Sequence, residues 1–378
     1  MDERYQSLFV PAEGIYLLNH SIGRPLRNTQ EAWSTAFLRP WEAEGEATWP
    51  HWLQAIDRFR SALSQLLNSP AAQFCPQNNL SSALNKVLSC FEPTEHRHTL
   101  VFSEHDFPSM AYVLQQAQRR GFRLKMLPAD LDVSSPSVWS DFLTEDVAAA
   151  LVTHVHSNTG LKTPVDKICA LAATKGVVSI VDVAQSAGVV PIDLSQWQAD
   201  FVIGSCVKWL CGGPGAGYLW IAEHRLSSSE PTDVGWFSHE DPFEFDINSF
   251  RYAEDALRFW GGTPSVAPFV VATNAIEQLC DIGIDTIRSH NLRLIDRLAE
   301  QLSSENLVTP LDHNSRGGTV VVRFPSDQLA VVRDQLTQAR VAFDVRPTGI
   351  RLSPHIYNDL HEIEAACAAL TIESGQRN

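Results

Sequence analysis

The sequence lacks any apolar run that approaches the roughly 20 residues required by a membrane-spanning helix. Its first residues, Met1 to Val10, mix polar and apolar side chains. They also lack the basic start and the apolar stretch of a secretory signal peptide. We therefore expect a protein with no membrane partner and a cytoplasmic location.

Basic charge is scarce. The chain has 29 Lys and Arg residues against 44 Asp and Glu residues, a formal net charge of -15. An acidic surface repels the phosphates of nucleic acids, and no basic run reverses this locally. We expect no nucleic-acid partner.

Cysteine pairs at metal-binding or disulfide spacing are also missing. The seven cysteines are odd in number and include no C-x-x-C pair, which argues against a disulfide framework and a zinc knuckle. His154 and His156 alternate along a predicted strand and so point to opposite faces. We therefore expect no metal site.

Apolar strands and helices alternate through the middle of this 378-residue chain. The predicted strands lie at 99–103, 122–127, 147–155, 177–181, 201–203 and 218–221, and the predicted helices at 52–67, 80–91, 108–120 and 165–175. Strands that are apolar on both faces are typical of a parallel sheet covered by helices on both sides. The pattern predicts an α/β protein.

Three segments are expected along the chain. Residues 1–50 form an irregular arm, rich in Pro and Trp, of the kind that wraps a partner subunit. Residues 51–265 form a large domain, and residues 266–378 form a smaller α+β domain. The smaller domain should begin with one long helix or two over 264–302 and continue with strands at 320–324 and 341–345 and a helix at 359–370.

Polar side chains follow the apolar strands where these strands end. Asp182 closes the strand of VSIVDVAQSAG (178–188), and Gln185 follows it. Ser205 ends the next strand, and Lys208 comes three residues later, before a Gly-rich turn. In parallel sheets the chemistry lies just beyond the carboxyl ends of the strands. A third polar cluster, VTHVHSNTG (152–160), should join the other two.

These residue types match the needs of pyridoxal 5′-phosphate (PLP). A lysine binds this cofactor covalently, and a carboxylate beside the pyridine nitrogen stabilises its protonated form. The phosphate needs hydroxyls and the N–H groups of a helix start. Asp182, Gln185, Ser205 and Lys208 supply several of these parts in a suitable order, so we predict a PLP enzyme.

The motif D-x-x-Q followed by S-x-x-K-W-L-x-G-G-P-G-x-G resembles the class V branch of the fold-type I PLP enzymes, and the likeness extends over nearly the whole chain. It implies a large domain with a mostly parallel sheet between helices and a smaller α+β C-terminal domain. It also implies a homodimer whose active site lies at the subunit interface. Lys208 would be the Schiff-base lysine and Asp182 the partner of the ring nitrogen. Gln185 would contact the phenolic oxygen, and Ser205 the phosphate.

Further segments are similar to those of class V relatives. NNLSSAL (78–84) and DFPSM (106–110) imply that Leu80 and Ser81 hold the phosphate and that Phe107 covers the ring. GWFSH (235–239) and RFWGGTPS (258–265) imply that Trp236 and Thr263 reach the partner subunit's phosphate. GIRLSPHIYN (349–358) implies that Arg351 binds the substrate carboxylate.

Two polar residues of the 152–160 cluster complete the candidate site. Asn158 stands where the family has a second substrate contact, and His156 is a candidate pocket residue. Simpler roles stay open: Phe107 as a core aromatic, Trp236 as a packing residue, Arg351 as an ion-pair partner and His156 as a structural histidine.

The reaction is less defined than the cofactor. One hypothesis is an aminotransferase acting on a small amino acid, and another is a kynureninase-like hydrolase or β-lyase. A third is a catalytically silent relative. A desulfurase is disfavoured because residues 345–354 contain no cysteine. Met110, Val207 and Gly262 depart from the kynureninase pattern.

Overall fold

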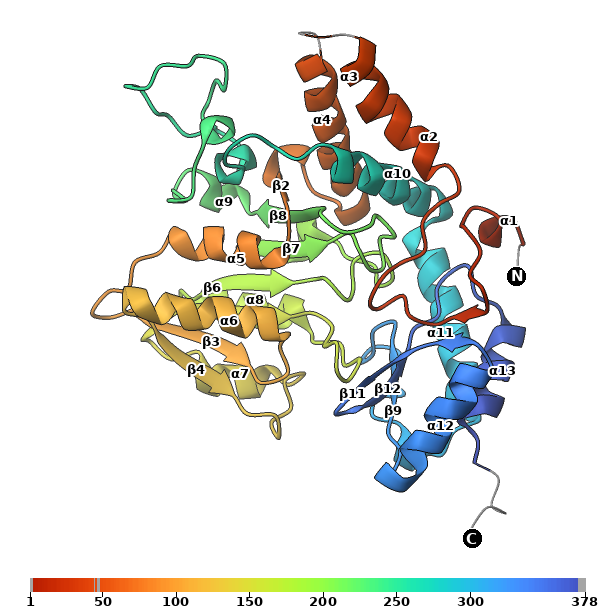
Figure 1. Cartoon of the computed structure of the whole chain (residues 1–378). Coiled ribbons are helices and arrows are strands. Elements are labelled where there is room, and N and C mark those ends of the chain that lie inside the picture. The colour runs from red at the N-terminus through yellow and green to blue at the C-terminus, as the bar shows by residue number, and fades with distance from the viewer. Residues whose placement is uncertain (1–2, 44, 46–47, 373–378) are drawn as a thin grey trace.

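The large domain is built on a seven-stranded sheet with the order β2-β8-β7-β6-β5-β3-β4. The computed structural model describes residues 3–43, 45 and 48–372 (Figure 1). The strands are β2 (Phe74–Gln77), β3 (Thr99–Ser103), β4 (Arg123–Leu127), β5 (Val147–Thr153), β6 (Val178–Asp182), β7 (Phe201–Ser205) and β8 (Gly217–Ile221). Strand β8 is antiparallel to both neighbours, while β7, β6, β5, β3 and β4 run parallel. The predicted mostly parallel sheet is confirmed.

Helices cover both faces of this sheet (Figure 1). Helices α5 (Leu80–Ser89) and α6 (Pro108–Ala117) pack on one face, where Leu151 and Ile180 are buried. Helices α4 (Thr48–Leu67) and α8 (Val165–Thr174) belong to the core on the other face, with Val152 and Val181. Side chains alternate between the faces of a strand, so strands buried on both sides are continuously apolar. Helix α7 (Pro136–Phe142) packs beside α8.

The small domain has a three-stranded antiparallel sheet, β11-β12-β9, packed against helices. Its strands are β9 (Val320–Val322), β11 (Asp344–Arg346) and β12 (Gly349–Leu352). Its helices are α11 (Ile284–Glu300), α12 (Ser326–Gln338) and α13 (Leu360–Leu370). The second domain of the predicted architecture is thus present.

The region expected to hold one helix or two contains two. Gly283, with a φ of 88°, separates α10 (Ala267–Ile282) from α11. A positive φ is easy only for glycine, so the chain turns there. Helix α10 packs into the large-domain core, with the Phe269 ring 4.9 Å from that of Phe59. Helix α10 thus shares its core with the large domain, and the boundary after residue 265 stays a prediction.

The N-terminal arm crosses the chain's own small domain (Figure 1). After α1 (Glu3–Gln6), strand β1 (Ile15–Tyr16) pairs in parallel with β10 (Val341–Ala342), and Leu18 forms a bridge to Ser353. The arm continues through α2 (Thr29–Trp33), a π-helical turn η1 (Ser34–Leu38) and α3 (Arg39–Ala43). Contact with a partner subunit stays a prediction.

Several short elements complete the described chain. They are α9 (Glu223–Leu226), η3 (Ala71–Gln73), η4 (Gln118–Arg120), η5 (Leu194–Gln196), η6 (Trp236–Ser238), η7 (Ala256–Phe259) and η8 (Ser304–Asn306). Strand β2 was not predicted, because Pro76 lacks an N–H donor and argues against a strand. Among the described helices, none is both long enough and apolar enough to cross a membrane.

Candidate active site

A cavity of about 180 Å³ opens where β5, β6 and β7 end. The strand register places Thr153 opposite Asp182, and Asp182 opposite Ile203, so the polar strand ends meet at one edge of the sheet. Seven of the predicted cofactor residues border this cavity: Leu80, Ser81, Phe107, Asp182, Gln185, Ser205 and Lys208. These seven residues come from four separate segments of sequence, and the two segments that follow β6 and β7 converge as the strand-end argument predicts.

Lys208 and Asp182 are the ionisable pair of the cavity. Burial lowers the pKa of the Lys208 amine, an effect that the nearby Asp182 carboxylate partly opposes. Burial likewise raises the pKa of Asp182. The Ala184 N–H, which donates to Asp182 Oδ1 at 2.8 Å, partly opposes this rise because it stabilises the carboxylate. A lysine with a lowered pKa is more often neutral, and the neutral amine is the nucleophile.

Phe107 lies on the wall of the cavity beside the lysine. The Lys208 Nζ atom is 5.5 Å from the centre of the Phe107 ring. Phe107 immediately precedes α6 and is 45% exposed, so its ring borders the cavity rather than the core. The alternative of a plain core aromatic does not fit this exposure, and a flat group here can cover a bound ring.

The start of α5 supplies the anion-binding end of the cavity. Asn79 caps this helix, because its side chain accepts a hydrogen bond from the Ser82 N–H at 2.9 Å. The first N–H groups of a helix favour a bound anion, and the hydroxyls of Ser81 and Ser205 border the same cavity. A phosphate fits this end.

Gln185 is held from both ends of its amide. Its Nε2 donates to the His20 carbonyl at 3.0 Å, and its Oε1 accepts from the Trp209 indole N–H at 3.0 Å. One amide N–H is left, since a glutamine amide carries two. Gln185 is thus a rigid part of the wall with one donor to offer.

The predicted substrate residues lie outside the cavity lining. Arg351 is buried and pairs with Asp344, while its Nη1 donates at 2.8 Å to the carbonyl of Ser157, which does line the cavity. Asn158 has a buried Oδ1 with no hydrogen-bond partner among the described residues. Arg351 therefore stands directly behind the wall, and Asn158 follows the lining residue Ser157 in the sequence.

His156 also stands behind the wall, within a polar cluster. Its Nε2 lies 3.3 Å from the Thr163 hydroxyl, and its Nδ1 lies 3.4 Å from the His105 carbonyl. Burial lowers its pKa to about 4, so the ring is neutral near pH 7. These contacts favour the structural role that was left open for this histidine.

Trp236 and Thr263 lie apart from the cavity of their own chain. The Trp236 indole N–H donates to the Thr263 hydroxyl at 3.3 Å. The Trp236 ring belongs to an aromatic cluster with Trp49, Phe237 and Phe243. Their action on a partner's cofactor therefore stays a prediction.

Sequence reasoning missed several residues of the cavity and its surroundings. The unpredicted lining residues are Asn79, Ser109, Met110, Thr153, Val155, Ser157 and Ala184. Asp106 stands nearby, where its Oδ2 accepts from the Ser103 N–H at 2.8 Å and burial raises its pKa to about 7. The signal that could have revealed it is its place in DFPSM, directly before Phe107.

The donor set fits PLP. Asp182 lines the cavity, and its Oδ2 atom makes no hydrogen bond to the described residues, so a carboxylate oxygen is left for a ring nitrogen. Lys208, Phe107 and the start of α5 supply the amine, the flat cover and the phosphate end.

Comparison with known structures defines the class. A cystine C-S lyase, C-DES, in complex with cysteine persulfide matches with a TM-score of 0.84 at 22% identity, covering 95% of this chain and 97% of the other. The apo cysteine desulfurase of Thermococcus onnurineus matches with a TM-score of 0.83 at 21% identity, covering 95% of this chain and 94% of the other. The fold is that of the fold-type I PLP enzymes.

The family follows from the sequence comparisons. The model of the class V aminotransferases matches residues 50–365, and the chain belongs to this family. A kynureninase of Deinococcus radiodurans is 32% identical over 359 residues, 90% of this chain and 85% of that protein. An uncharacterized aminotransferase of Bacillus subtilis is 25% identical over 320 residues, 84% of each chain. The protein is therefore a PLP-dependent enzyme of a family that acts on small amino acids, which removes the hypothesis of a silent relative.

Proposed function

We propose that the protein is an aminotransferase acting on a small amino acid, with Lys208 as the base at the substrate Cα. The observation that carries this proposal is the composition of the cavity wall. Among the described residues that border it, Lys208 and Asp182 are the titratable side chains. Asp182 is suited to the ring nitrogen, so a single group remains to carry protons.

Transamination needs only one proton carrier, because the proton taken from Cα is returned to the cofactor nearby. When bound, PLP supplies the electron sink for the pair left at Cα. The pKa of Lys208, lowered by burial, brings its amine closer to the operating pH, where a general base is most efficient. Asp182 holds the protonated ring, Phe107 covers one face, and the start of α5 fixes the phosphate.

A kynureninase-like hydrolase or β-lyase is the second candidate, and the 32% identity to a kynureninase favours it. Such reactions need a further group that protonates the departing fragment or activates water. The wall offers Met110, which is 2% exposed, where the resembling kynureninase segment has an acid. Val207 and Gly262 also differ from the kynureninase pattern, and these differences likewise favour a different substrate.

Desulfurase chemistry is disfavoured because no cysteine is suitably placed to act as its nucleophile. Its nucleophilic cysteine must lie on a mobile loop, and the nearest candidates, Cys280 and Cys367, are in α10 and α13. Burial raises the thiol pKa of both to about 11, so neither is a ready thiolate.

A homodimer with Trp236 and Thr263 acting across the interface forms part of the proposal. The loop between η6 and η7 projects from the large domain (Figure 1), and its Phe245 and Ile247 side chains are 71% and 97% exposed.

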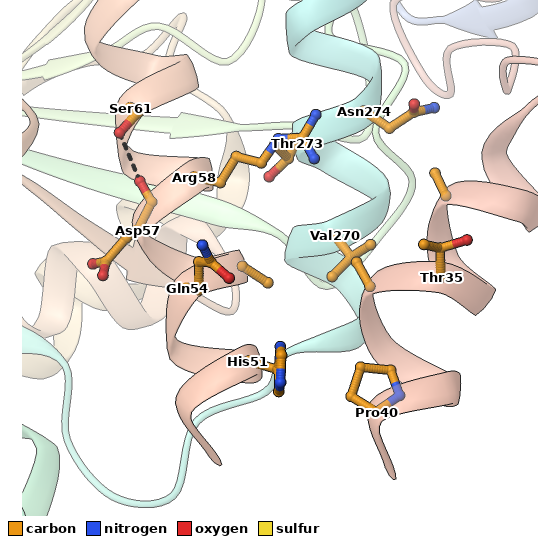
Figure 2. A pocket seen from close by; sticks show the side chains of 13 residues that line it. Thr35, Pro40, His51, Gln54, Asp57, Arg58, Ser61, Val270, Thr273 and Asn274 are labelled. Carbon is orange, nitrogen blue, oxygen red and sulfur yellow. Dashed lines mark hydrogen bonds between the residues drawn. The ribbon is translucent and has the colours of Figure 1, made fainter. Parts of the chain in front are cut away.

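A second hollow of about 640 Å³ lies between the arm, α4 and α10 and shares no residue with the cavity at Lys208. Figure 2 shows Thr35, Pro40 and Val270 along it. Trp41, the residue after Pro40 on α3, is 59% exposed. Apolar surfaces of this kind suit a subunit contact.

A cytoplasmic location is proposed with the dimer. All seven cysteines are free, as expected in a reducing compartment. Fractionation of the producing cells and sedimentation of the purified protein test the location and the dimer.

The test of the reaction is a single-turnover screen of the PLP-loaded protein with amino acids in the absence of a keto acid. An aminotransferase should release one equivalent of keto acid per site, lose the visible absorption of the cofactor and then stop. Continued release of ammonia, or of alanine, without an acceptor would instead identify a lyase or hydrolase.

A further inference from the structure

Lys86 is a buried lysine on α5 that does not border the cavity at Lys208. Its Nζ atom donates to the carbonyls of Phe259 and Trp260, each at 2.9 Å, and the Asp233 carboxylate lies 3.7 Å from the same amine. A buried ammonium is costly unless hydrogen bonds and a counter-charge compensate it. The two carbonyls and the carboxylate supply this compensation, so the amine is fixed against residues 259–260.

The backbone on both sides of this contact is fixed as well. The Gln77 side chain, at the end of β2, donates from Nε2 to the Phe259 carbonyl at 3.1 Å. The Gly261 N–H donates to the Ser238 hydroxyl at 2.9 Å, and the Gly261 carbonyl accepts from the Phe237 N–H at 3.0 Å. Each carbonyl from residue 259 to residue 261 therefore accepts a hydrogen bond from a residue distant in the sequence. Among the described residues, only Lys86 donates to the middle one.

Gly261 gives the amine its close approach to the turn. Its φ is 106°, a conformation that glycine adopts readily and other residues rarely adopt. A Cβ atom at this position would lie 3.0 Å from Lys86 Nζ, closer than ordinary contact allows. The glycine and the lysine therefore fit each other.

The loop is free immediately after this anchor. Gly262 and Thr263 are exposed, and a Cβ atom added to Gly262 would meet no described atom within 4 Å. Within the described part of the chain, no group accepts a hydrogen bond from the Gly262 N–H. The Thr263 hydroxyl accepts one from the Trp236 indole at 3.3 Å and is still able to donate its own proton. A rigid base thus carries a tip with donors to offer to a second molecule.

We propose that Lys86 is a positioning residue for the cofactor site of the partner subunit. By fixing residues 259–261, it presents the Gly262 N–H and the Thr263 hydroxyl to the cofactor phosphate of that subunit. The inference rests on the proposed homodimer, in which this loop crosses the interface. Ordering mobile donors costs free energy when a ligand binds, and a tip that is ordered in advance avoids this cost.

The experiment titrates the cofactor-free protein with PLP and with pyridoxal, which lacks the phosphate, and follows the absorbance of the bound cofactor. Lys86→Met has a similar length but no donor. It should weaken PLP binding roughly tenfold and leave pyridoxal binding unchanged, because only the phosphate meets the tip. Lys86→Gln keeps an N–H donor and should weaken PLP binding less.

The matched control is Lys175→Met. Lys175 also donates from Nζ to a backbone carbonyl, that of Ser140 at 2.6 Å, but it makes this contact in another part of the large domain. The variant loses the same type of hydrogen bond and should bind PLP as the unaltered protein does. Unchanged PLP affinity in Lys86→Met would overturn the proposal. So would equal weakening of PLP and pyridoxal, which indicates general damage to the fold.

Hybrid dimers assign the effect to a subunit. In the first hybrid, Lys86→Met and Lys208→Ala are on one chain, so the remaining Lys208 receives the altered loop. In the second hybrid, the two substitutions are on different chains, so the remaining Lys208 receives an unaltered loop. Attachment of PLP to that lysine, measured by borohydride reduction at increasing PLP concentration, should be weakened roughly tenfold in the first hybrid only.

The outcomes separate this inference from the proposed reaction. Weakened attachment in the second hybrid alone contradicts the inference, because Lys86 would then act within its own chain through α5. If the amino acid screen identifies a lyase but attachment still depends on Lys86 across the interface, the proposed reaction fails and this inference stands.

Discussion

The two sides of the site differ in how their charges are compensated. On the large-domain side, Lys208 and Asp182 have few protein partners and face a cavity, so a cofactor completes their interactions. On the small-domain side, Arg351 is already paired with Asp344 and the Ser157 carbonyl. The comparison indicates that the first side is arranged to hold one resident group permanently. The second side already has protein partners for its charges, which suits the predicted binding of a passing substrate carboxylate by Arg351.

The largest expected effect is that of removing the covalent anchor. Lys208→Ala should lower kcat by at least about 10³-fold, because the base at Cα is lost. Borohydride reduction followed by mass spectrometry should then find no cofactor attached to the chain. The control is Lys167→Ala, an exposed lysine on α8, which should behave as the unaltered protein. Retained attachment in Lys208→Ala would remove the basis of the proposed mechanism.

Two buried carboxylates near the cavity allow the next comparison. Asp182→Asn should lower kcat about 10²- to 10³-fold, because the neutral amide no longer stabilises the protonated ring. Asp106→Asn should have a much smaller effect, since Asp106 stands outside the lining and its pKa, near 7, already favours partial protonation. Equal losses in kcat for the two variants contradict the assignment of Asp182 to the ring nitrogen.

Acidification should destabilise both sides of the site through buried histidines. Burial lowers the pKa of His154 to about 3 and that of His20 to about 4. A folded pKa below the unfolded value of about 6.5 means that stability is present above pH 6.5 and is lost as the pH falls towards the folded pKa. At pH 5, the lowered pKa of each histidine should reduce the free energy of unfolding by about 2 kcal/mol.

Urea unfolding at pH 7 and pH 5 measures this loss. His154→Leu should lose about 2 kcal/mol less than the unaltered protein over that interval, since one proton uptake is removed. The same loss in both proteins contradicts a neutral, buried His154.

The smallest expected effect concerns the cap of α5. Asn79→Ala should lower the free energy of unfolding by about 1 kcal/mol, because the Ser82 N–H loses its acceptor. Asn78→Ala is the neighbouring control and should change it by less than about 0.5 kcal/mol. Weaker phosphate binding in Asn79→Ala alone, measured by calorimetry on the cofactor-free protein, would sharpen the assignment of this helix start.

The large-domain side was largely predictable from the sequence. Asp182 and Ser205 close apolar strands, and Lys208 follows with a Gly-rich turn. Strand periodicity together with the rule that parallel strands end at one edge places these residues together. Phe107 and Ser81 were predicted from the resemblance of their segments to those of class V relatives, and both border the cavity. Local pattern therefore suffices where neighbouring strands carry the site.

The small-domain side was not predictable to the same degree. Arg351 was identified, but its pairing with Asp344 depends on the antiparallel register of β11 and β12, and β12 was not predicted as a strand. His20 reaches Asp344 only because the arm crosses the small domain. These contacts join residues 7 and 324 positions apart, and no periodicity encodes the second separation.

Order along the chain was enough to predict the fold class, the cofactor and the lysine, since each depends on residues that strand ends bring together. The compensation of Arg351 by Asp344 and the placing of His156 behind the wall needed the folded chain. Electrostatic compensation depends on distance in space and on burial, and both arise only when the arm, the large domain and the small domain pack against one another.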